Sequence, residues 1–490
     1  MHSLFTRIGA LQVLGGLVFF VRTKVGALVL GPAGVGIVSV VDQFVQLILQ
    51  LSAFAIPFAA IKLLSKAHSE SAEAFESAYA ALLRLLLILG SVGAALGIAL
   101  IFFRPGWVGA SLAPYAPLAV IGLLALPAMI PHGFFRNVLA AAMRPTSSAV
   151  WDVVSAAIMT GAVIVGILLF REPGYFVGAL VGAVVVSGSY YLYLARRLGL
   201  SMTGPPTSVR SLLKANPTFV ELSLVSYVVA FVTPLALLIV RTTVLDNFGE
   251  ATAGLLQAAI GISLAINLVL NPLNGLLLTP RLNRMLAESE KHRDAKAFQK
   301  KLLLAIAVVT LPPLLFPDLA LIVLYSSQFV EAAHALYWFV LSQAMMQITG
   351  VYTALMIGLD RLKGYGVVAV VGTAANAVLA ILLVPSLGLT GAGIAAFTSA
   401  SLLALGTFGY LRARDGFAIG RAAGLGTLLL FAGLGLAGAF VGTRSSFDVP
   451  NLLAKSLVCV VALGLMVPIS LDRDERRALA ARLGAAFRRR

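Results

Sequence analysis

Apolar runs of about twenty residues recur along the whole chain, and they limit the possible folds more than any motif does. A helix of that length crosses the hydrocarbon core of a bilayer. Hydrophobic residues make up 60% of the 490 residues and charged residues only 11%, which is too little charge to cover a soluble protein of this size. The sequence therefore predicts an all-α protein that spans a membrane many times.

About fourteen runs reach the length of a membrane span. We place them at residues 5–30, 35–62, 78–103, 116–142, 146–170, 174–195, 218–245, 252–279, 302–324, 333–358, 364–384, 390–411, 420–441 and 452–471. The first run is too long for the apolar part of a signal peptide, so we expect it to remain as a span. Pro117, Pro127 and Pro131 lie in the fourth run, and we expect that helix to be kinked.

The cations of the chain gather on one side of this predicted membrane topology. With the N-terminus inside, 29 of the 36 lysines and arginines fall on the cytoplasmic side and 4 on the opposite side, while the other three lie inside spans. This asymmetry follows the positive-inside rule and predicts that both termini are cytoplasmic. Basic loops that face anionic membrane lipids also account for the net charge of +16 without a nucleic-acid partner.

The sequence lacks the usual signatures of a metal or cofactor site. Cys459 is the only cysteine, which excludes a disulfide within the chain and a cysteine-based metal site. The GPAGVG segment at Gly31–Gly36 is not a nucleotide loop, because the Lys and Ser/Thr that would follow it are absent and no such motif occurs elsewhere. We interpret this segment as a tight turn between two spans, and we expect no cofactor.

A short segment near the N-terminus returns in the middle of the chain. VRTKV at Val21–Val25 recurs as VRTTV at Val240–Val244, and Ala33-Gly34 matches Ala253-Gly254 at an offset of 220 residues. An offset of six helices keeps both copies in the same membrane orientation. The repeat therefore predicts two parallel six-helix lobes related by an axis along the membrane normal.

We expect two pseudo-symmetric six-helix lobes around a central cavity, followed by two additional C-terminal transmembrane helices. The predicted parts are an N-terminal lobe 1–200, a cytoplasmic connecting loop 201–217, a C-terminal lobe 218–414, two further helices in 415–471, and a basic cytoplasmic tail 472–490. The tail has the pattern of an amphipathic helix that lies at the membrane interface.

Charged residues inside the spans are the first candidates for a substrate site. Arg22 lies nine residues before Gly31, or about 13 Å from the outer turn, and Asp42 lies at a similar depth on the next helix. Arg241 is the equivalent of Arg22 in the second lobe, and Gln257 enters on the helix that follows it. Because guanidinium groups bind phosphate through paired hydrogen bonds, two such arginines facing one cavity predict an anionic, phosphorylated substrate.

These charges also have structural alternatives. Lys24 is nearer the turn than Arg22 and about 200° around the helix from it, so it can snorkel to the headgroups. Asp42 is either a structural counter-charge to Arg22 or a proton or sodium site.

Polar side chains form stripes on three of the predicted helices. Asp42, Gln46 and Gln50 follow an i, i+4, i+8 pattern. The other two stripes consist of Asn267, Asn271 and Asn274, and of Gln343 and Gln347. Such stripes either line a wet cavity or hydrogen-bond neighbouring helices, and the first interpretation would suit an oligosaccharide headgroup.

The segment LGPAGVGIVSVVDQFVQL, the arginine in the span before it and the helix end AIKLLSKAHSE resemble the Wzx-type polysaccharide flippases. These form part of the multidrug/oligosaccharidyl-lipid/polysaccharide (MOP) exporter superfamily. The close match is Leu30–Glu70, while hydropathy and the two-lobe organisation extend the resemblance over about the whole chain.

The resemblance implies a bacterial inner-membrane protein that serves surface polysaccharide biosynthesis, such as that of O-antigen. It would move an undecaprenyl-diphosphate-linked oligosaccharide from the cytoplasmic to the outer leaflet by alternating access, alongside other polysaccharide-assembly proteins. On this pattern Arg22, Lys24 and Arg241 hold the diphosphate. The two extra C-terminal helices are instead similar to those of the fourteen-span lipid II flippases.

Three alternative functions stay open at this point. An ion-coupled small-molecule or multidrug antiporter of the same superfamily would favour buried acids, whereas the predicted cavity is basic. A lipid II flippase is favoured by the two extra C-terminal helices. A polysaccharide polymerase in the membrane is the most distant, because the outer loops are short and no paired carboxylates or histidine cluster are found. We therefore expect a transporter and not an enzyme.

Overall fold

A computed structural model describes residues 2–54, 56–103, 112–202, 217–442, 444–471 and 475–476. Within these ranges the chain is helical, with fourteen α-helices and four short 3-10 or π segments. The α-helices of the first half are α1 (His2–Ala53), α2 (Ile56–Glu70), α3 (Ala72–Phe103), α5 (Ala116–Leu124), α6 (Leu126–Ala141), α7 (Pro145–Leu198) and α9 (Pro217–Pro272). Those of the second half are α10 (Thr279–Arg284), α11 (Glu288–Leu315), α12 (Pro317–Leu324), α13 (Ala333–Gly358), α14 (Leu362–Asp415), α15 (Arg421–Leu436) and α16 (Val449–Ser470). The short segments are η1 (Ala113–Tyr115), η2 (Leu273–Leu278), η3 (Ser327–Ala332) and η4 (Ala437–Gly442).

The chain is a multi-pass, all-helical membrane protein. Among the described residues, eight helices are long and apolar enough to cross a membrane, or nine if the bent pair η1–α5 and α6 is one span. That pair is bent by 45° at Ala125, which confirms the kink predicted from the prolines of this region.

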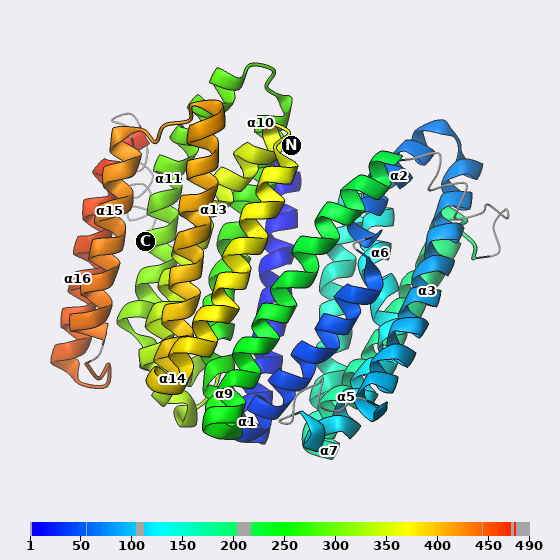
Figure 1. Cartoon of the computed structure of the whole chain (residues 1–490), viewed down its shortest axis with the longest axis horizontal. Helices are drawn as coiled ribbons and strands as arrows, with labels where there is room; N and C mark the ends of the chain where they lie inside the picture. Colours follow the sequence, from blue (N-terminus) through cyan, green and yellow to red (C-terminus); the bar gives the residue numbers. More distant parts are fainter. Residues whose placement is uncertain are drawn as a thin grey trace. The chain divides into compact units, whose positions relative to one another are not determined.

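Four helices are about twice the length that one crossing needs, and each is interrupted at a single residue. α1 has 52 residues and a non-helical Gly31, and α7 has 54 residues and a non-helical Arg171. The breaks of α9 and α14 lie at Gly249 and Gly388. Figure 1 shows the two halves of α1 running in opposite directions from its bend, so this element is a helical hairpin.

Contacts inside α7 show that it is a hairpin as well. A Cβ on Gly174 would lie 1.8 Å from the carbonyl oxygen of Gly166, and one on Gly178 would lie 2.4 Å from that of Ala162. In a straight helix, residues sixteen positions apart are about 24 Å from each other. The two arms of α7 therefore pack backbone to backbone through their glycines, which is the close packing that small residues allow in membranes.

The arms of α14 meet in the same way. The hydroxyl of Ser399 donates a 2.6 Å hydrogen bond to the carbonyl oxygen of Gly372, although the two residues are 27 positions apart. A Cβ on Gly391 would lie 2.5 Å from the carbonyl oxygen of Leu383. α14 is thus a third hairpin, joined by a buried hydroxyl as well as by glycine contacts.

The backbone itself carries an internal repeat. Residues with positive φ recur at a spacing of 217 or 218 positions: Gly249 lies 218 positions after Gly31, and Gly388 lies 217 positions after Arg171. The same spacing of 217 joins Met143 to Asp360 and Gly199 to Gly416. Of the nine described residues with positive φ, only Phe54 has no counterpart in this series. The turns between helices therefore repeat, even where the residue type differs.

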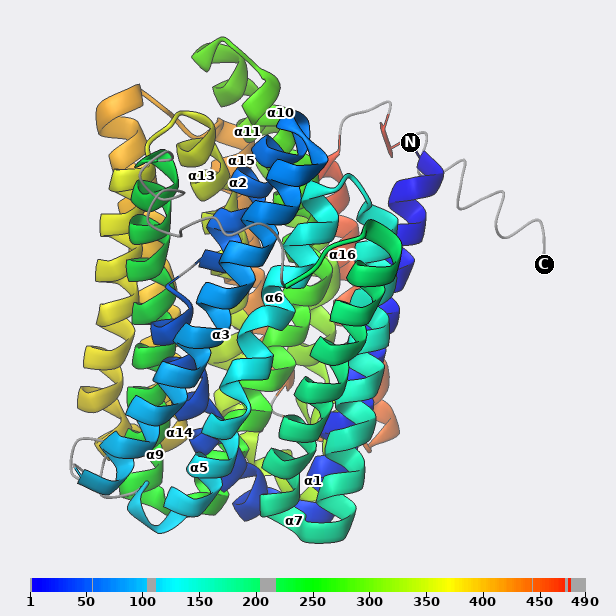
Figure 2. The same cartoon turned by 90° about the vertical axis from the view of Figure 1, so that its right-hand side faces the viewer.

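The chain forms two compact units, residues 1–257 and 258–490. In the first, α1 packs along α7, and the two lie side by side in Figure 2. Two apolar clusters form its core: one is built around Tyr79, Phe134 and Tyr190, and the other around Val41, Phe44 and Phe176. In the second unit, α13 and α14 make the most extensive contact, and α11 packs against α13, α15 and α16.

Several helix ends differ from those expected. α1 ends at Ala53 and a separate α2 begins at Ile56, where the sequence predicts one span to residue 62. Phe316 divides the expected span 302–324 into α11 and α12, because Pro317 occupies the first position of the new helix. The predicted tail helix lies outside the described residues except for 475–476, and the connecting loop is described only at 201–202 and 217.

Candidate functional site

Three of the predicted intramembrane charges lie together in the first unit. Arg22 is on the first arm of α1, Asp42 on its second arm, and Arg241 on the first arm of α9. The positive charges of Arg22 and Arg241 both act on the carboxylate of Asp42, which also accepts a hydrogen bond from the side chain of Gln46. We call Arg22, Asp42, Tyr175 and Arg241 the charged cluster.

Aromatic rings hold Arg22 in place. Its guanidinium carbon lies 4.8 Å from the centroid of the Phe19 ring and 5.9 Å from that of the Tyr175 ring. Tyr175 is near Asp42 and Arg241 as well as Arg22, so it forms a wall of the cluster from α7. Cation–π contacts of this kind stabilise a guanidinium that has little water around it.

The cluster is partly open. Arg241 is only 6% exposed, whereas Arg22, Asp42 and Tyr175 are half-buried. Two guanidinium groups and one carboxylate leave one positive charge in excess. Such a site can hold an anion, since the carboxylate balances only one of the two cations.

The surrounding backbone brings α1 and α9 very close to each other within this unit. A Cβ on Gly36 would lie 2.0 Å from the carbonyl oxygen of Glu250, and one on Gly254 would lie 1.9 Å from that of Pro32. The side-chain amide of Gln43 also donates a 3.1 Å hydrogen bond to the carbonyl oxygen of Pro234. These contacts position Arg241 beside the α1 hairpin, and they require glycine at both crossing points.

The other candidates in the first unit lie on the same helices. Lys24 and Gln50 are half-buried on the two arms of α1, and Gln257 is half-buried on the second arm of α9. Gln46 is the member of the α1 stripe that contacts a charged residue of the cluster.

The candidates in the second unit form an amide network. The side-chain amide of Gln347 donates hydrogen bonds to the Oδ1 atoms of Asn267, at 2.6 Å, and Asn271, at 3.1 Å. Asn274 donates in turn to the backbone carbonyl of Gln347, at 3.2 Å. Gln347 is 2% exposed, whereas Asn267 is half-buried and Asn271 is exposed, so this network joins α13 to α9 and η2 around one buried amide. Gln343, one turn before Gln347, is half-buried.

A family profile described as "Polysaccharide biosynthesis protein" matches residues 6–286, which is more than half of the chain. The chain belongs to the polysaccharide biosynthesis protein family. No curated protein matches it by sequence.

Solved structures show the fold of this family member. "Inward-facing conformation of a multidrug resistance MATE family transporter of the MOP superfamily" matches 83% of this chain and 94% of its own, with a TM-score of 0.66 and 19% identity. "Lipid II flippase MurJ, inward closed conformation" matches 95% of this chain and 98% of its own, with a TM-score of 0.67 and 14% identity. "Reverse polarity of binding pocket suggests different function of a MOP superfamily transporter from Pyrococcus furiosus" matches 84% of this chain and 95% of its own, with a TM-score of 0.60 and 17% identity. The chain therefore has the fold of these MOP superfamily transporters.

Two residues that matter to this geometry are not among the candidates predicted from the sequence. Tyr175 follows the bend of α7 and reaches Arg22 from another helix, and only the Pro-Gly before it signals a nearby turn. Tyr115 donates a short hydrogen bond to the carboxylate of Glu250, which follows the bend of α9. Both contacts join residues more than 100 positions apart, so no local pattern could have indicated them.

Proposed function

We propose that this protein is a flippase for an oligosaccharide linked to undecaprenyl diphosphate, working for surface polysaccharide biosynthesis. The observation that carries the proposal is the position of Arg22 and Arg241 on one carboxylate, Asp42. The residual positive charge suits a diphosphate, which binds guanidinium groups through charge-assisted hydrogen bonds. Membership of the polysaccharide biosynthesis family supports a lipid-linked sugar as the substrate.

In this proposal each of the four long helices crosses the membrane twice. With the remaining candidate spans and α15, this gives the fourteen crossings expected from the sequence. The repeated turns support two six-helix lobes, 1–200 and 218–414, that are related by pseudo-symmetry and alternate between two open states. Both termini lie on the cytoplasmic side of the cell membrane.

Lipid II is the second candidate substrate. The match to MurJ extends over 95% of this chain, whereas the matches to MATE transporters extend over 83–84%, so more of this chain has a counterpart in the lipid II flippase fold. Lipid II also carries a diphosphate, and the charged cluster suits either molecule. A drug antiporter fits less well, because a cationic drug would meet two arginines and one acid.

The test is the sidedness of lipid-linked oligosaccharide in cells that lack this protein. Wild type, Arg22→Ala, Arg241→Ala and the control Arg197→Ala, an exposed arginine at the end of α7, are each returned to these cells. We expect the glycolipid to accumulate in the cytoplasmic leaflet and to be cleared by wild type and Arg197→Ala only. Loss of one charge-assisted contact costs about 1.5–3 kcal/mol, or roughly 10- to 100-fold in translocation rate.

Two results would contradict the proposal. Unchanged sidedness without the protein would exclude flipping of the glycolipid. Full activity of both arginine variants, at normal amounts in the membrane, would exclude the charged cluster as the diphosphate site. Measuring lipid II sidedness in the same cells separates the two candidate substrates.

A further inference from the structure

The second unit contains a cavity of about 780 Å³ whose lining residues belong neither to the charged cluster nor to the amide network. Its walls come from the α11–α12 junction, η3, the start of α13, the region of the α14 bend, and η4 with residues 444–447. These elements lie at the end of the unit opposite the basic segment at the start of α11. The volume is within the range of pockets that bind small molecules, about 300–1,000 Å³.

One wall of the cavity is aromatic and held in a fixed position. The rings of Tyr337 and Trp338 are 5.1 Å apart and nearly perpendicular, at 81°, and both residues are half-buried. The Tyr337 hydroxyl donates a 3.2 Å hydrogen bond to the carbonyl oxygen of Gly435. A Cβ on Gly438 would lie 2.2 Å from the Tyr337 ring, so the absence of a side chain there makes room for the ring.

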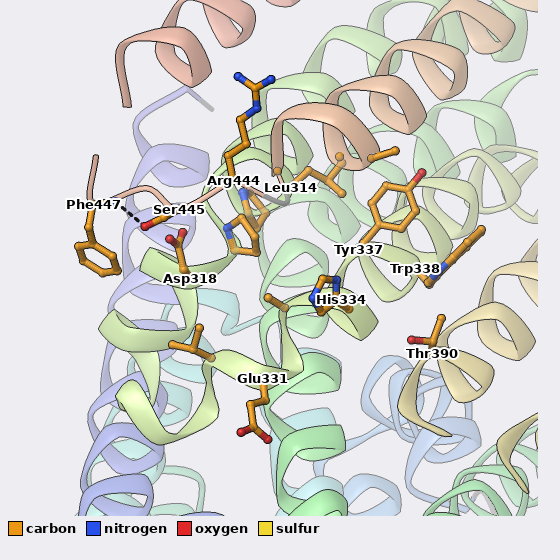
Figure 3. Close-up of a pocket in the computed structure, with 17 residues that line it drawn as sticks. Leu314, Asp318, Glu331, His334, Tyr337, Trp338, Thr390, Arg444, Ser445 and Phe447 are labelled. Atoms are coloured by element: carbon orange, nitrogen blue, oxygen red, sulfur yellow. Dashed lines mark hydrogen bonds between the residues drawn. The ribbon is translucent and has the colours of Figure 1, made fainter. Parts of the chain in front are cut away.

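The opposite walls are polar, and their net charge is balanced. Glu331, His334 and Arg444 are exposed side chains that line the cavity, and Figure 3 shows Glu331 and Arg444 extending in opposite directions with His334 between them. Thr390 adds a hydroxyl group near the aromatic pair. The charge of the buried carboxylate of Asp318 is balanced by the buried ammonium group of Lys455, and Ser446 donates two hydrogen bonds to this carboxylate.

This combination favours one class of ligand. A strong anion would meet Glu331 and a strong cation would meet Arg444, while a lipid chain would bury the polar groups without hydrogen bonds. A neutral sugar has an apolar ring face for an aromatic wall and hydroxyl groups that both donate and accept hydrogen bonds. We infer that this cavity is a binding site for a neutral oligosaccharide, with Tyr337 and Trp338 as its stacking wall and His334 and Thr390 among its hydrogen-bonding groups.

The sugar is either free or part of a lipid-linked glycan. The inference rests on the proposed function only if the sugar belongs to the lipid-linked glycan. The site itself is distinct from the diphosphate site, which lies in the first unit. Binding of free sugar therefore tests the cavity independently of glycolipid flipping.

Isothermal titration of the purified full-length protein in detergent micelles tests the site. The probes are maltotriose, mannotriose and triacetylchitotriose, with trigalacturonic acid as a charged comparison. We expect saturable binding of at least one neutral trisaccharide, weakened more than ten-fold by Tyr337→Leu and by the smaller change Thr390→Val. The control Tyr410→Leu removes a tyrosine near the C-terminal end of α14, away from the bend that lines the cavity. This variant should bind as wild type does.

The sidedness assay then identifies the source of the sugar. If Thr390→Val slows glycolipid translocation, the site holds the sugar of the transported lipid, and if translocation is unchanged, it holds a free oligosaccharide. The inference is overturned if none of the three neutral trisaccharides binds, if trigalacturonic acid binds more tightly than all of them, or if Tyr337→Leu and Thr390→Val both bind as wild type does.

Discussion

The guanidinium carbon of Arg22 on α1 lies 5.9 Å from the centre of the Tyr175 ring on α7. The same ring is close to Asp42 and Arg241, so one aromatic side chain borders all three charges of the cluster. Rings in such positions attract a cation without neutralising it, which leaves its charge available to an anionic ligand. Tyr175 therefore separates two roles that a carboxylate would combine, namely holding Arg22 and cancelling its charge.

We predict that Tyr175→Leu slows glycolipid translocation by roughly 3- to 30-fold, because a cation–π contact contributes about 0.5–2 kcal/mol. Tyr175→Phe keeps the ring and should retain most of the activity. Translocation is measured by glycolipid sidedness, normalised to the amount of protein in the membrane. Equal loss in Phe and Leu variants would show that the hydroxyl group, and not the ring, is what the cluster needs.

The amide network predicts that replacing Gln347 lowers the stability of the protein rather than its transport activity. Replacing this residue by Leu removes the side-chain amide that donates to Asn267 and Asn271, at a cost of about 1–3 kcal/mol in the free energy of unfolding, while the bond from Asn274 to the backbone carbonyl remains. The measurement is thermal unfolding in detergent, with Gln50→Leu on the half-buried part of α1 as the control. If the network only joins helices, translocation per folded molecule stays as in wild type. A large loss of translocation without loss of stability would instead place Gln347 in the transport path.

The position of Arg22, Asp42 and Arg241 could be predicted from the sequence for a physical reason. Charges inside apolar helices are costly, so they need partners at the same depth, and depth follows from the distance in sequence to a turn. The GPAGVG turn and the VRTKV repeat supplied both distances. The residues that border the cluster from elsewhere, such as Tyr175, carry no comparable signal, because a tyrosine in an apolar run is ordinary.

The bends of the long helices were only partly predictable. Gly31 and Gly388 follow the usual preference for glycine at positive φ, whereas Arg171 adopts φ of 55° without being glycine. Its guanidinium donates a 3.2 Å hydrogen bond to the carbonyl oxygen of Val29, which helps to fix this unusual conformation. The spacing of 217 positions between Arg171 and Gly388 shows that the turn is set by the repeated fold and not by the residue.

Close crossing of α1 and α9 predicts that Gly254 does not tolerate a side chain. A Cβ there would lie 1.9 Å from the carbonyl oxygen of Pro32, so Gly254→Ala requires the two backbones to separate. We expect it to lower the free energy of unfolding by about 1–3 kcal/mol, the usual range for overpacking. Gly161→Ala on α7 is the matched control, because a Cβ at Gly161 has nothing within 4 Å. Equal unfolding temperatures of the two variants in detergent would contradict the crossing.

We predict that Asp318 makes a pH-dependent contribution to stability. This residue lies at the start of α12, outside the candidate spans. Burial opposes ionisation of this carboxyl group, but hydrogen bonds from Ser446 and Leu319 and the charge of Lys455 outweigh it and hold its pKa below the ordinary 3.8. Lys455 is fully buried. It donates a 2.6 Å hydrogen bond to the carbonyl oxygen of Arg444 and a 2.8 Å hydrogen bond to the hydroxyl oxygen of Ser446, so Lys455 and Asp318 together hold this segment in place.

Because the folded-state pKa of Asp318 lies below the unfolded value, its ionised form stabilises the protein at neutral pH. The contribution is complete above the unfolded value and is lost as the pH falls below 3.8 toward the folded-state value. We expect Asp318→Asn to lower the free energy of unfolding at pH 7 by about 1–3 kcal/mol, the cost of weakening buried hydrogen bonds. The difference from wild type should shrink as the pH is lowered through 3.8. Unfolding in detergent at several pH values measures this, with the exposed Asp360→Asn as the control, since asparagine tolerates the positive φ of that position. A difference that is the same at every pH would mean that the side chain acts through its shape and not through its charge.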